Sequence, residues 1–172
     1  KISDGRFLTT GGMGTMGYSL PAALGAKLAR PERDVFVVCG DGSFQMNSQE
    51  LSTCLQYHLP LKIIIMDNKA LGNVKQWQDM FYGGRHSETI LNDNPDFVKL
   101  AEAYGHVGMR ILLPSELHDG LAEAFSDKYK DRLVLIDIRI DPEEKVFPMQ
   151  LGGGAMCDIR FSETETTETA RK

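Results

Sequence analysis

Residues 35–72 read VFVVCGDGSFQMNSQELSTCLQYHLPLKIIIMDNKALG and contain the clearest indication of the fold. Its two apolar runs, Val35–Cys39 and Leu61–Met66, have the composition of strands that are covered on both faces. Between them, the apolar spacing predicts a helix over Ser48–Tyr57. Strand, helix and strand within about 30 residues predict a parallel βαβ unit.

Polar residues follow each of these strands. Gly40-Asp41-Gly42 comes after the first strand, and Asp67-Asn68 comes after the second. Ligands bind beyond the carboxyl ends of parallel strands, so we expect the two groups to lie side by side. Mg²⁺ prefers oxygen ligands and is commonly held by one or two carboxylates together with phosphates. The spacing therefore predicts a site for a cation that carries a diphosphate.

The rest of the chain continues the alternation of helices and strands. Further helices are expected to begin near Ser19, Gly72, Asn94 and Pro114, and further strands over Val107–Ile111 and Leu133–Ile140. Asn47, with Glu50 three residues later, has the form of a capping box for the helix that follows. The predicted fold class is α/β, a doubly wound and mainly parallel sheet with helices on both faces.

Composition limits the function classes. A net charge of −5 and the lack of a basic run argue against nucleic-acid binding, and no apolar stretch is long enough to cross a membrane. Three cysteines show no metal spacing, and two of them lie in apolar patterns, which indicates buried free thiols in a reducing compartment. The expected location is the cytoplasm of a bacterial-type cell. Residues 1–158 are expected to form one domain of a longer protein. The Thr- and Glu-rich residues 159–172 are expected to be a disordered tail.

A glycine-rich motif lies near the start of the chain. Gly12, Gly14 and Gly17 fit the dinucleotide fingerprint G-x-G-x-x-G, but no apolar strand precedes them. Asp41, the one candidate for a ribose-binding acid, is 29 residues beyond Gly12 and stands between two glycines. A nicotinamide or flavin site is therefore disfavoured, and a simple close-packed turn remains an alternative.

The spacing of Gly-Asp-Gly and Asp-Asn, with residues 43–66 between them, resembles the thiamine diphosphate-binding motif of thiamine-dependent enzymes. Other stretches resemble the C-terminal cofactor-binding domain of acetohydroxyacid synthase (acetolactate synthase) large catalytic subunits. These are GGMGTMGYSLPAA (11–23), QWQ (76–78), NPDF (94–97) and FPM (147–149). KQWQDMFYGGRH (75–86) and LAEAYGHV (100–107) most resemble the bacterial isozyme III type. The resemblance covers roughly residues 9–158 and implies the thiamine diphosphate-binding fold.

The resemblance implies a ligand set for Mg²⁺ and thiamine diphosphate. The side chains of Asp41 and Asn68 and the backbone carbonyl of Ala70 would bind the metal. The diphosphate would be held by Gly42, Ser43, Leu71 and Gly72. The carbonyl of Gly14 would accept a hydrogen bond from the 4′-amino group of the pyrimidine. Met16 would bend the cofactor so that this group approaches the thiazolium C2, which is catalysis by proximity.

Two residues are implied for the substrate channel, and two positions depart from the family pattern. Trp77 and Asn73 would line the channel, although Trp77 has an alternative as a surface aromatic and Met16 as a core residue. Asn73 stands where the enzyme usually has Met, which bears on substrate preference. Asp67 stands where the family usually has Asn, which adds a negative charge beside the diphosphate.

The resemblance also implies what the complete protein does. It would decarboxylate pyruvate and condense the hydroxyethyl unit with a second 2-keto acid, in branched-chain amino acid synthesis. It would be a homodimer or higher oligomer, with a small regulatory subunit as a further partner. The activating glutamate and the FAD would lie upstream of this chain, so no catalytic residue is expected here and the isolated chain should be inactive.

Two alternatives remain open. The first is another thiamine enzyme, such as a pyruvate oxidase, a glyoxylate carboligase or a benzoylformate decarboxylase, against which Gln76-Trp77-Gln78 argues. The second is a non-catalytic module that keeps the fold without the cofactor, for which Asp67 and Asn73 are the sequence indications.

Overall fold

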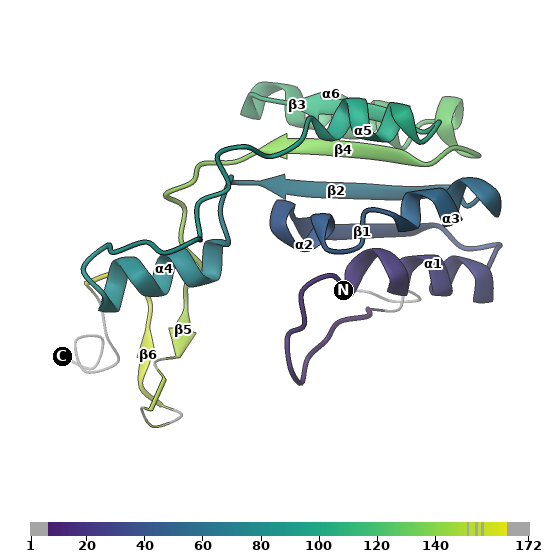
Figure 1. The fold of residues 1–172 in the computed structure, drawn as a ribbon. Coiled ribbons are helices and arrows are strands. Elements are labelled where there is room, and N and C mark those ends of the chain that lie inside the picture. Colours follow the sequence, from purple (N-terminus) through teal and green to yellow (C-terminus); the bar gives the residue numbers. More distant parts are fainter. Residues whose placement is uncertain (1–6, 151, 154, 156, 165–172) are drawn as a thin grey trace.

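The computed structural model describes residues 7–150, 152–153, 155 and 157–164. At its centre is a parallel sheet of four strands in the order β1-β2-β4-β3 (Figure 1). The strands are β1 (Val35–Gly40), β2 (Leu61–Asp67), β3 (Val107–Ile111) and β4 (Val134–Arg139). All three pairings are parallel, so the four strands end at the same edge of the sheet. The predicted α/β fold with a parallel sheet is confirmed.

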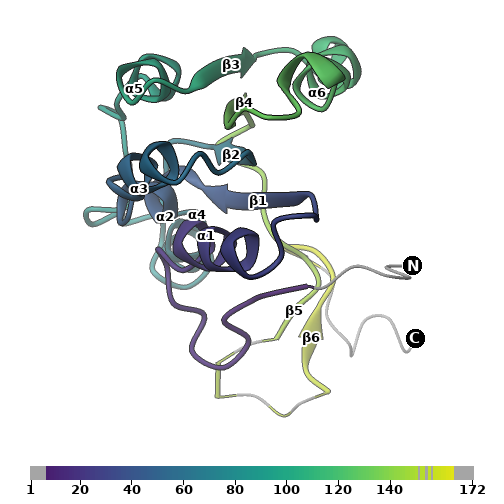
Figure 2. The same ribbon diagram turned by 90° about the vertical axis from the view of Figure 1, so that its right-hand side faces the viewer.

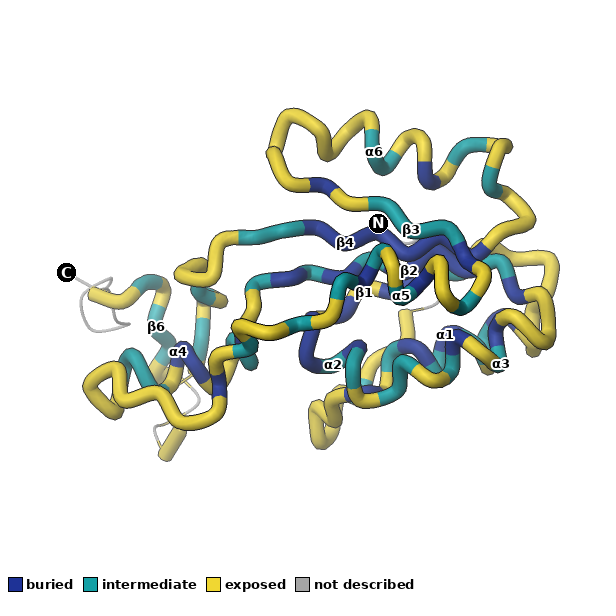
Figure 3. Tube along the Cα trace, turned by 45° about the horizontal axis from the view of Figure 1, so that its top comes forward, coloured by how far each residue is buried: buried dark blue, intermediate teal, exposed yellow. Residues whose placement is uncertain are grey.

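Helices cover both faces of this sheet (Figure 2). One face packs against α1 (Ser19–Ala29), α2 (Asp41–Gln45), α3 (Glu50–Gln56) and α5 (Phe97–Ala103). The other face packs against α6 (Leu117–Ala124), which covers β3 and β4. Short 3₁₀ turns lie at Pro114–Glu116 and Asp127–Tyr129. Figure 3 shows the central strands as the most deeply buried part of the chain.

The core explains why these segments become strands. Ile63 and Ile65 of β2 are fully buried on one face, together with Leu61. Phe44 of α2 and Phe97 of α5 meet above this face edge to face, with ring centroids 5.6 Å apart. Edge-to-face pairs of buried rings add to the stability that burial alone provides. Cys39 and Cys54 are buried free thiols, as the sequence predicts, whereas Cys157 is exposed.

A smaller unit lies beyond the carboxyl ends of the strands (Figure 1). It consists of α4 (Gly72–Phe81) and the antiparallel strands β5 (Met149–Gln150) and β6 (Ile159–Arg160). The disordered tail predicted from residue 159 therefore begins with residues that pair in a strand. Residues 165–172 of that expected tail lie outside the described part of the chain.

The helix expected over Ser48–Tyr57 is present as α3, but it begins at Glu50, and a separate helix, α2, starts directly at Asp41. The capping box predicted at Asn47 is wrong. Asn47 does not cap α3, because its Nδ2 donates to the carbonyl oxygen of Gly17 at 2.8 Å. Gly17 is buried, and a buried backbone carbonyl needs a hydrogen-bond partner. The Asn47 side chain provides that partner.

Candidate functional site

Asp41 lies at the carboxyl end of β1, as the first residue of α2. Its side chain is buried, and each carboxylate oxygen has one partner. Oδ1 accepts a hydrogen bond from the Gly42 backbone N–H at 2.9 Å, and Oδ2 accepts one from Asn94 Nδ2 at 2.6 Å. Burial raises the pKa of the Asp41 carboxyl above its ordinary value, these two hydrogen bonds oppose that rise, and the neighbouring Asp67 carboxyl adds to it. Lone pairs on both oxygens remain for a cation.

Asn68 and Ala70 lie in the turn after β2. The Asn68 Oδ1 atom accepts a hydrogen bond from the Ala70 backbone N–H at 3.1 Å. Residues 89–91 hold this turn from outside: Leu71 N–H donates to the Thr89 carbonyl at 2.9 Å, and Leu91 N–H donates to the Lys69 carbonyl at 2.8 Å. The turn is thereby fixed by main-chain bonds, which keeps the oxygen atoms of Asn68 and Ala70 in place.

Gly42 is the point where three segments meet. A Cβ atom at this position would lie 2.6 Å from Leu71 Cδ2, 3.3 Å from Leu91 Cδ1 and 3.4 Å from Met16 Cε. The glycine-rich loop, the turn after β1 and the turn after β2 therefore converge. The structure thus brings together three of the residues predicted for one site, Met16, Gly42 and Leu71.

The glycine-rich loop is tied to α2 through Ser43. The Gly17 N–H donates to Ser43 Oγ at 2.9 Å, so the hydroxyl proton of Ser43 is left to donate elsewhere. Gly14 has a φ of +64°, which is the left-handed region that favours glycine, and its N–H donates to the Thr10 carbonyl at 2.8 Å. Met16 is 38% exposed, so it is not a core residue in this chain.

Gly72 begins α4 and packs closely against the Asn68 side chain. A Cβ atom at residue 72 would lie 2.7 Å from Asn68 Nδ2. The absence of a side chain at residue 72 therefore allows the Asn68 carboxamide to lie against the start of the helix.

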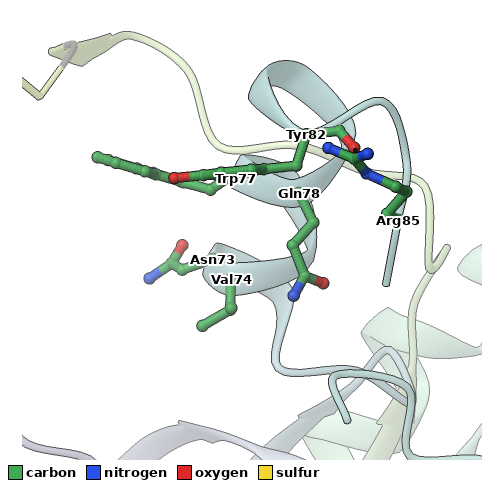
Figure 4. A pocket seen from close by; sticks show the side chains of 6 residues that line it. All are labelled: Asn73, Val74, Trp77, Gln78, Tyr82 and Arg85. Carbon is green, nitrogen blue, oxygen red and sulfur yellow. Dashed lines mark hydrogen bonds between the residues drawn. The ribbon is translucent and has the colours of Figure 1, made fainter. Parts of the chain in front are cut away.

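Helix α4 carries one side of a cavity of about 500 Å³ (Figure 4). The cavity is lined by Asn73, Val74, Trp77, Gln78, Tyr82 and Arg85. Trp77 is 41% exposed and packs edge to face on Phe81, with ring centroids 5.5 Å apart. The two residues predicted for a substrate channel, Asn73 and Trp77, thus line one cavity. Sequence reasoning missed the other four, although spacings of three and four residues on one helix indicate Val74 and Gln78.

Asp67 points into the fold. Its side chain is 1% exposed, and its Oδ2 lies 2.8 Å from Arg139 Nη1 on β4. The two atoms form a close ion pair without hydrogen-bond alignment, since both lack a hydrogen-bond partner among the described residues. The other oxygen, Oδ1, accepts from the Lys69 backbone N–H at 3.1 Å. Asp67 and Arg139 are direct neighbours in the pairing of β2 with β4, which the sequence alone does not reveal.

The described residues contain no group of three or more His, Cys, Asp or Glu side chains that could hold a metal ion. A cation between the two strand ends would therefore need neutral oxygen donors as well. Asp41, the Asn68 carboxamide and the Ala70 carbonyl make up an all-oxygen set with a single negative charge. Such a set fits Mg²⁺ bound together with phosphate oxygens and water.

Comparison with known proteins shows which family this chain is similar to. Residues 2–138 match the family model "Thiamine pyrophosphate enzyme, C-terminal TPP binding domain". The chain is 54% identical over 162 residues to the acetolactate synthase isozyme 3 large subunit of Escherichia coli K12, which covers 94% of this chain and 28% of that protein. It is 55% identical over 159 residues to the acetolactate synthase large subunit of Haemophilus influenzae, covering 92% of this chain and 27% of that protein.

A solved structure is also similar. The thiamine diphosphate-dependent 4-hydroxybenzoylformate decarboxylase of Rhodococcus jostii RHA1 matches with a TM-score of 0.66 and 32% identity. The match covers 73% of this chain and 23% of that one. This chain therefore spans about a quarter of the length of these relatives. In the described residues, no helix is both long and apolar enough to span a membrane. From the match over residues 2–138, the chain belongs to the thiamine pyrophosphate enzymes, as a C-terminal TPP binding domain.

Proposed function

We propose that this chain is the cofactor-binding domain of an acetolactate synthase large subunit. In this proposal the complete protein decarboxylates pyruvate and condenses the hydroxyethyl unit with a second 2-keto acid. The observation that carries the proposal is the convergence of three loops at Gly42, next to Asp41, with Asn68 in the turn after the neighbouring parallel strand. Identity of 54–55% to two acetolactate synthase large subunits supports this activity over that of the decarboxylase, at 32%.

In this proposal each predicted site residue contacts either the metal or one part of the cofactor. Asp41, Asn68 and Ala70 would hold Mg²⁺, and the diphosphate would bind at Gly42, Ser43, Leu71 and Gly72. The Gly14 carbonyl would orient the pyrimidine, and Met16, whose Cε lies close to Gly42, would support the bend between the two rings. Bound thiamine diphosphate supplies the electron sink that decarboxylation of a 2-keto acid requires. The protein's share of the work is to hold and shape the cofactor.

The cavity on α4 suits the second substrate. It begins at Asn73, directly after the proposed diphosphate residues Leu71 and Gly72, and Trp77 forms part of its wall. An aromatic wall would contact the aliphatic side chain of a 2-keto acid. The polar side chain of Asn73, at the end nearest Gly72, would influence which 2-keto acid is accepted.

The remaining parts of the enzyme are proposed to lie outside this chain. These are the activating glutamate, the FAD-binding domain, and the contacts that form a homodimer or higher oligomer with a small regulatory subunit. The proposed location is the bacterial cytoplasm. The isolated chain is accordingly predicted to form no acetolactate from pyruvate, measured by a colorimetric product assay at saturating cofactor. Product formation by the purified chain would refute this prediction.

Calorimetric titration of the complete protein with thiamine diphosphate, with and without Mg²⁺, tests the proposal. We expect binding that depends on Mg²⁺ and that is lost in Asp41→Asn. Asp93→Asn is the matched control, because Asp93 is an exposed carboxylate on the loop before α5. Absent or Mg²⁺-independent binding would favour the non-catalytic module. If binding occurs, the products formed from pyruvate distinguish the enzymes: acetolactate supports the proposal, and acetaldehyde or acetate contradicts it.

A further inference from the structure

Asn94 lies between the two acidic side chains at the strand ends. Its Nδ2 donates to Asp41 Oδ2 at 2.6 Å and to Asp67 Oδ1 at 3.2 Å. An amide nitrogen carries two protons, so it can serve both carboxylates at once. Asn94 is thus a direct bridge between the end of β1 and the end of β2.

Gln45 determines which way the Asn94 amide faces. Gln45 Nε2 donates to Asn94 Oδ1 at 2.9 Å, which leaves the Asn94 nitrogen to face the carboxylates. The reverse orientation would place the amide oxygen against the two acceptor oxygens of Asp41 and Asp67. It would also place two donors against each other at Gln45. The hydrogen-bond network therefore permits one orientation.

The backbone around Asn94 is held on its C-terminal side. Two residues later, Asp96 caps α5, with Oδ1 accepting from the Val98 and Lys99 backbone N–H groups at 3.1 and 3.2 Å. Arg110 of β3 lies 2.6 Å from the same oxygen and donates through Nε to Asp137 of β4 at 2.9 Å. The segment that carries Asn94 is thereby fastened to the sheet.

Asp67 lies close enough to Asp41 to add to the rise that burial causes in the pKa of the Asp41 carboxyl, but both of its own oxygens have other partners. Its Oδ2 lies against Arg139, and its Oδ1 is shared by Asn94 and the Lys69 backbone N–H. The guanidinium group offsets the charge of this buried carboxylate. Asp41 has no cationic partner of this kind among the hydrogen bonds and ion pairs of the described residues, and its charge is left for a cation.

We infer that Asn94 is a positioning residue for the metal site, which orients the Asp41 carboxylate toward a divalent cation and keeps Asp67 out of its coordination sphere. This inference rests on the proposed function. Asn94 itself ligates nothing, because its oxygen is engaged by Gln45 and its nitrogen by the two carboxylates. Partners of this kind, one step removed from a metal, strongly influence affinity because they fix the ligand before the metal arrives.

The test is the Mg²⁺ concentration that half-saturates the complete protein at saturating thiamine diphosphate. In Asn94→Ala we expect this concentration to rise by about 10- to 100-fold, the usual effect of removing such a partner. At saturating Mg²⁺, the kcat should return to within about threefold of the parent, because a high concentration compensates for weak binding. If Asn94 only stabilised the fold, excess Mg²⁺ would not restore the kcat of Asn94→Ala.

Asn92→Ala is the matched control, since Asn92 is an exposed residue of the same loop. Gln45→Ala is the second variant, which leaves Asn94 present but unoriented and is expected to shift the Mg²⁺ requirement in the same direction. Thermal unfolding without cofactor checks that each variant folds. If Asn94→Ala does not fold, Gln45→Ala decides the question.

The outcomes separate this inference from the proposed function. If the parent protein shows no Mg²⁺-dependent binding of thiamine diphosphate, both the proposed function and the role of Asn94 are overturned. If the parent binds and folded Asn94→Ala requires the same Mg²⁺ as Asn92→Ala, only the role of Asn94 is overturned. A loss of kcat that excess Mg²⁺ does not restore also overturns it.

Discussion

Gly42 shows at the scale of a single residue how closely the site is packed. Its missing side chain is what lets Leu71, Leu91 and Met16 approach the backbone at residue 42. The placement of Asp41 and Asn68 at the ends of two neighbouring parallel strands could be predicted from the sequence, because each follows an apolar run that reads as a strand. The contact of Asn94 with Asp41 could not be predicted from the sequence. The two residues are 53 positions apart, and no helix or strand periodicity relates them.

Gly42→Ala is predicted to weaken thiamine diphosphate binding while the protein still folds. The new methyl group would lie 2.6 Å from Leu71 Cδ2, so Leu71 must move, and with it the start of α4. Overpacking of this kind costs about 1–3 kcal/mol of unfolding free energy. Chemical denaturation measures this loss, and calorimetry measures the binding.

Gly40→Ala is the control for this substitution. A Cβ atom at Gly40 has no atom within 4 Å, and its φ of −79° suits any residue. We expect stability and binding close to those of the parent. If Gly40→Ala and Gly42→Ala lowered stability and binding equally, close packing at Gly42 would not explain the loss.

At the scale of elements, the strands were more predictable than the short helices. The apolar run of β2, with three isoleucines in sequence, is characteristic of a strand covered on both faces. Helix α2 has only five residues, DGSFQ, and is too short to display a helical period. The capping box predicted at Asn47 does not form, because the Asn47 side chain binds the carbonyl of Gly17, a residue distant in sequence.

Asp96→Ala is predicted to destabilise α5 in a pH-dependent manner. Hydrogen bonds from the Lys99 backbone and from Arg110 lower the pKa of the Asp96 carboxyl. A lowered folded-state pKa means that the carboxylate stabilises the fold above the unfolded pKa of about 3.9, and that this stability is lost as the pH falls through the folded pKa. Loss of the cap costs about 1 kcal/mol at neutral pH.

Denaturant unfolding of both proteins from pH 7 to pH 3 measures this effect. The difference in unfolding free energy between the parent and Asp96→Ala should be largest at pH 7 and should shrink below about pH 4. Asp93→Ala, an exposed residue of the preceding loop, should show a small difference at every pH. If the difference in unfolding free energy between the parent and Asp96→Ala stayed constant from pH 7 to pH 3, the ionised Asp96 carboxylate would not be the source of the stabilisation.

At the scale of the whole molecule, the unit beyond the sheet edge is held by two buried polar residues of α4. Gln76 pairs with the Val146 main chain, with its Nε2 donating to the carbonyl at 3.1 Å and its Oε1 accepting from the N–H at 2.9 Å. Lys75 Nζ lies 3.0 Å from both Asp79 and Glu143. The sequence could not predict these contacts, because residues 143–146 have no strand or helix pattern that would indicate a partner.

Gln76→Ala is predicted to loosen the segment that leads to β5. Removal of both bonds to Val146 would leave that segment without its main-chain partner on α4. Hydrogen exchange should increase over residues 145–150 and stay unchanged in β1, β2 and β4. Val74→Ala, an exposed change on the same helix, is the control. Faster exchange throughout the sheet would instead indicate general destabilisation.

The main-chain bonds that join residues 69–71 to residues 89–91 have an evolutionary consequence. They close a loop whose two ends are fixed, with α4 and its cavity in the interval between them. Mutations within that interval can remodel the cavity while Asn68 and Ala70 stay in register with Asp41. Selection could therefore change the proposed substrate cavity in this interval independently of the proposed cofactor site, and a departure such as Asn73 would leave Asn68 and Ala70, the proposed metal ligands, in place.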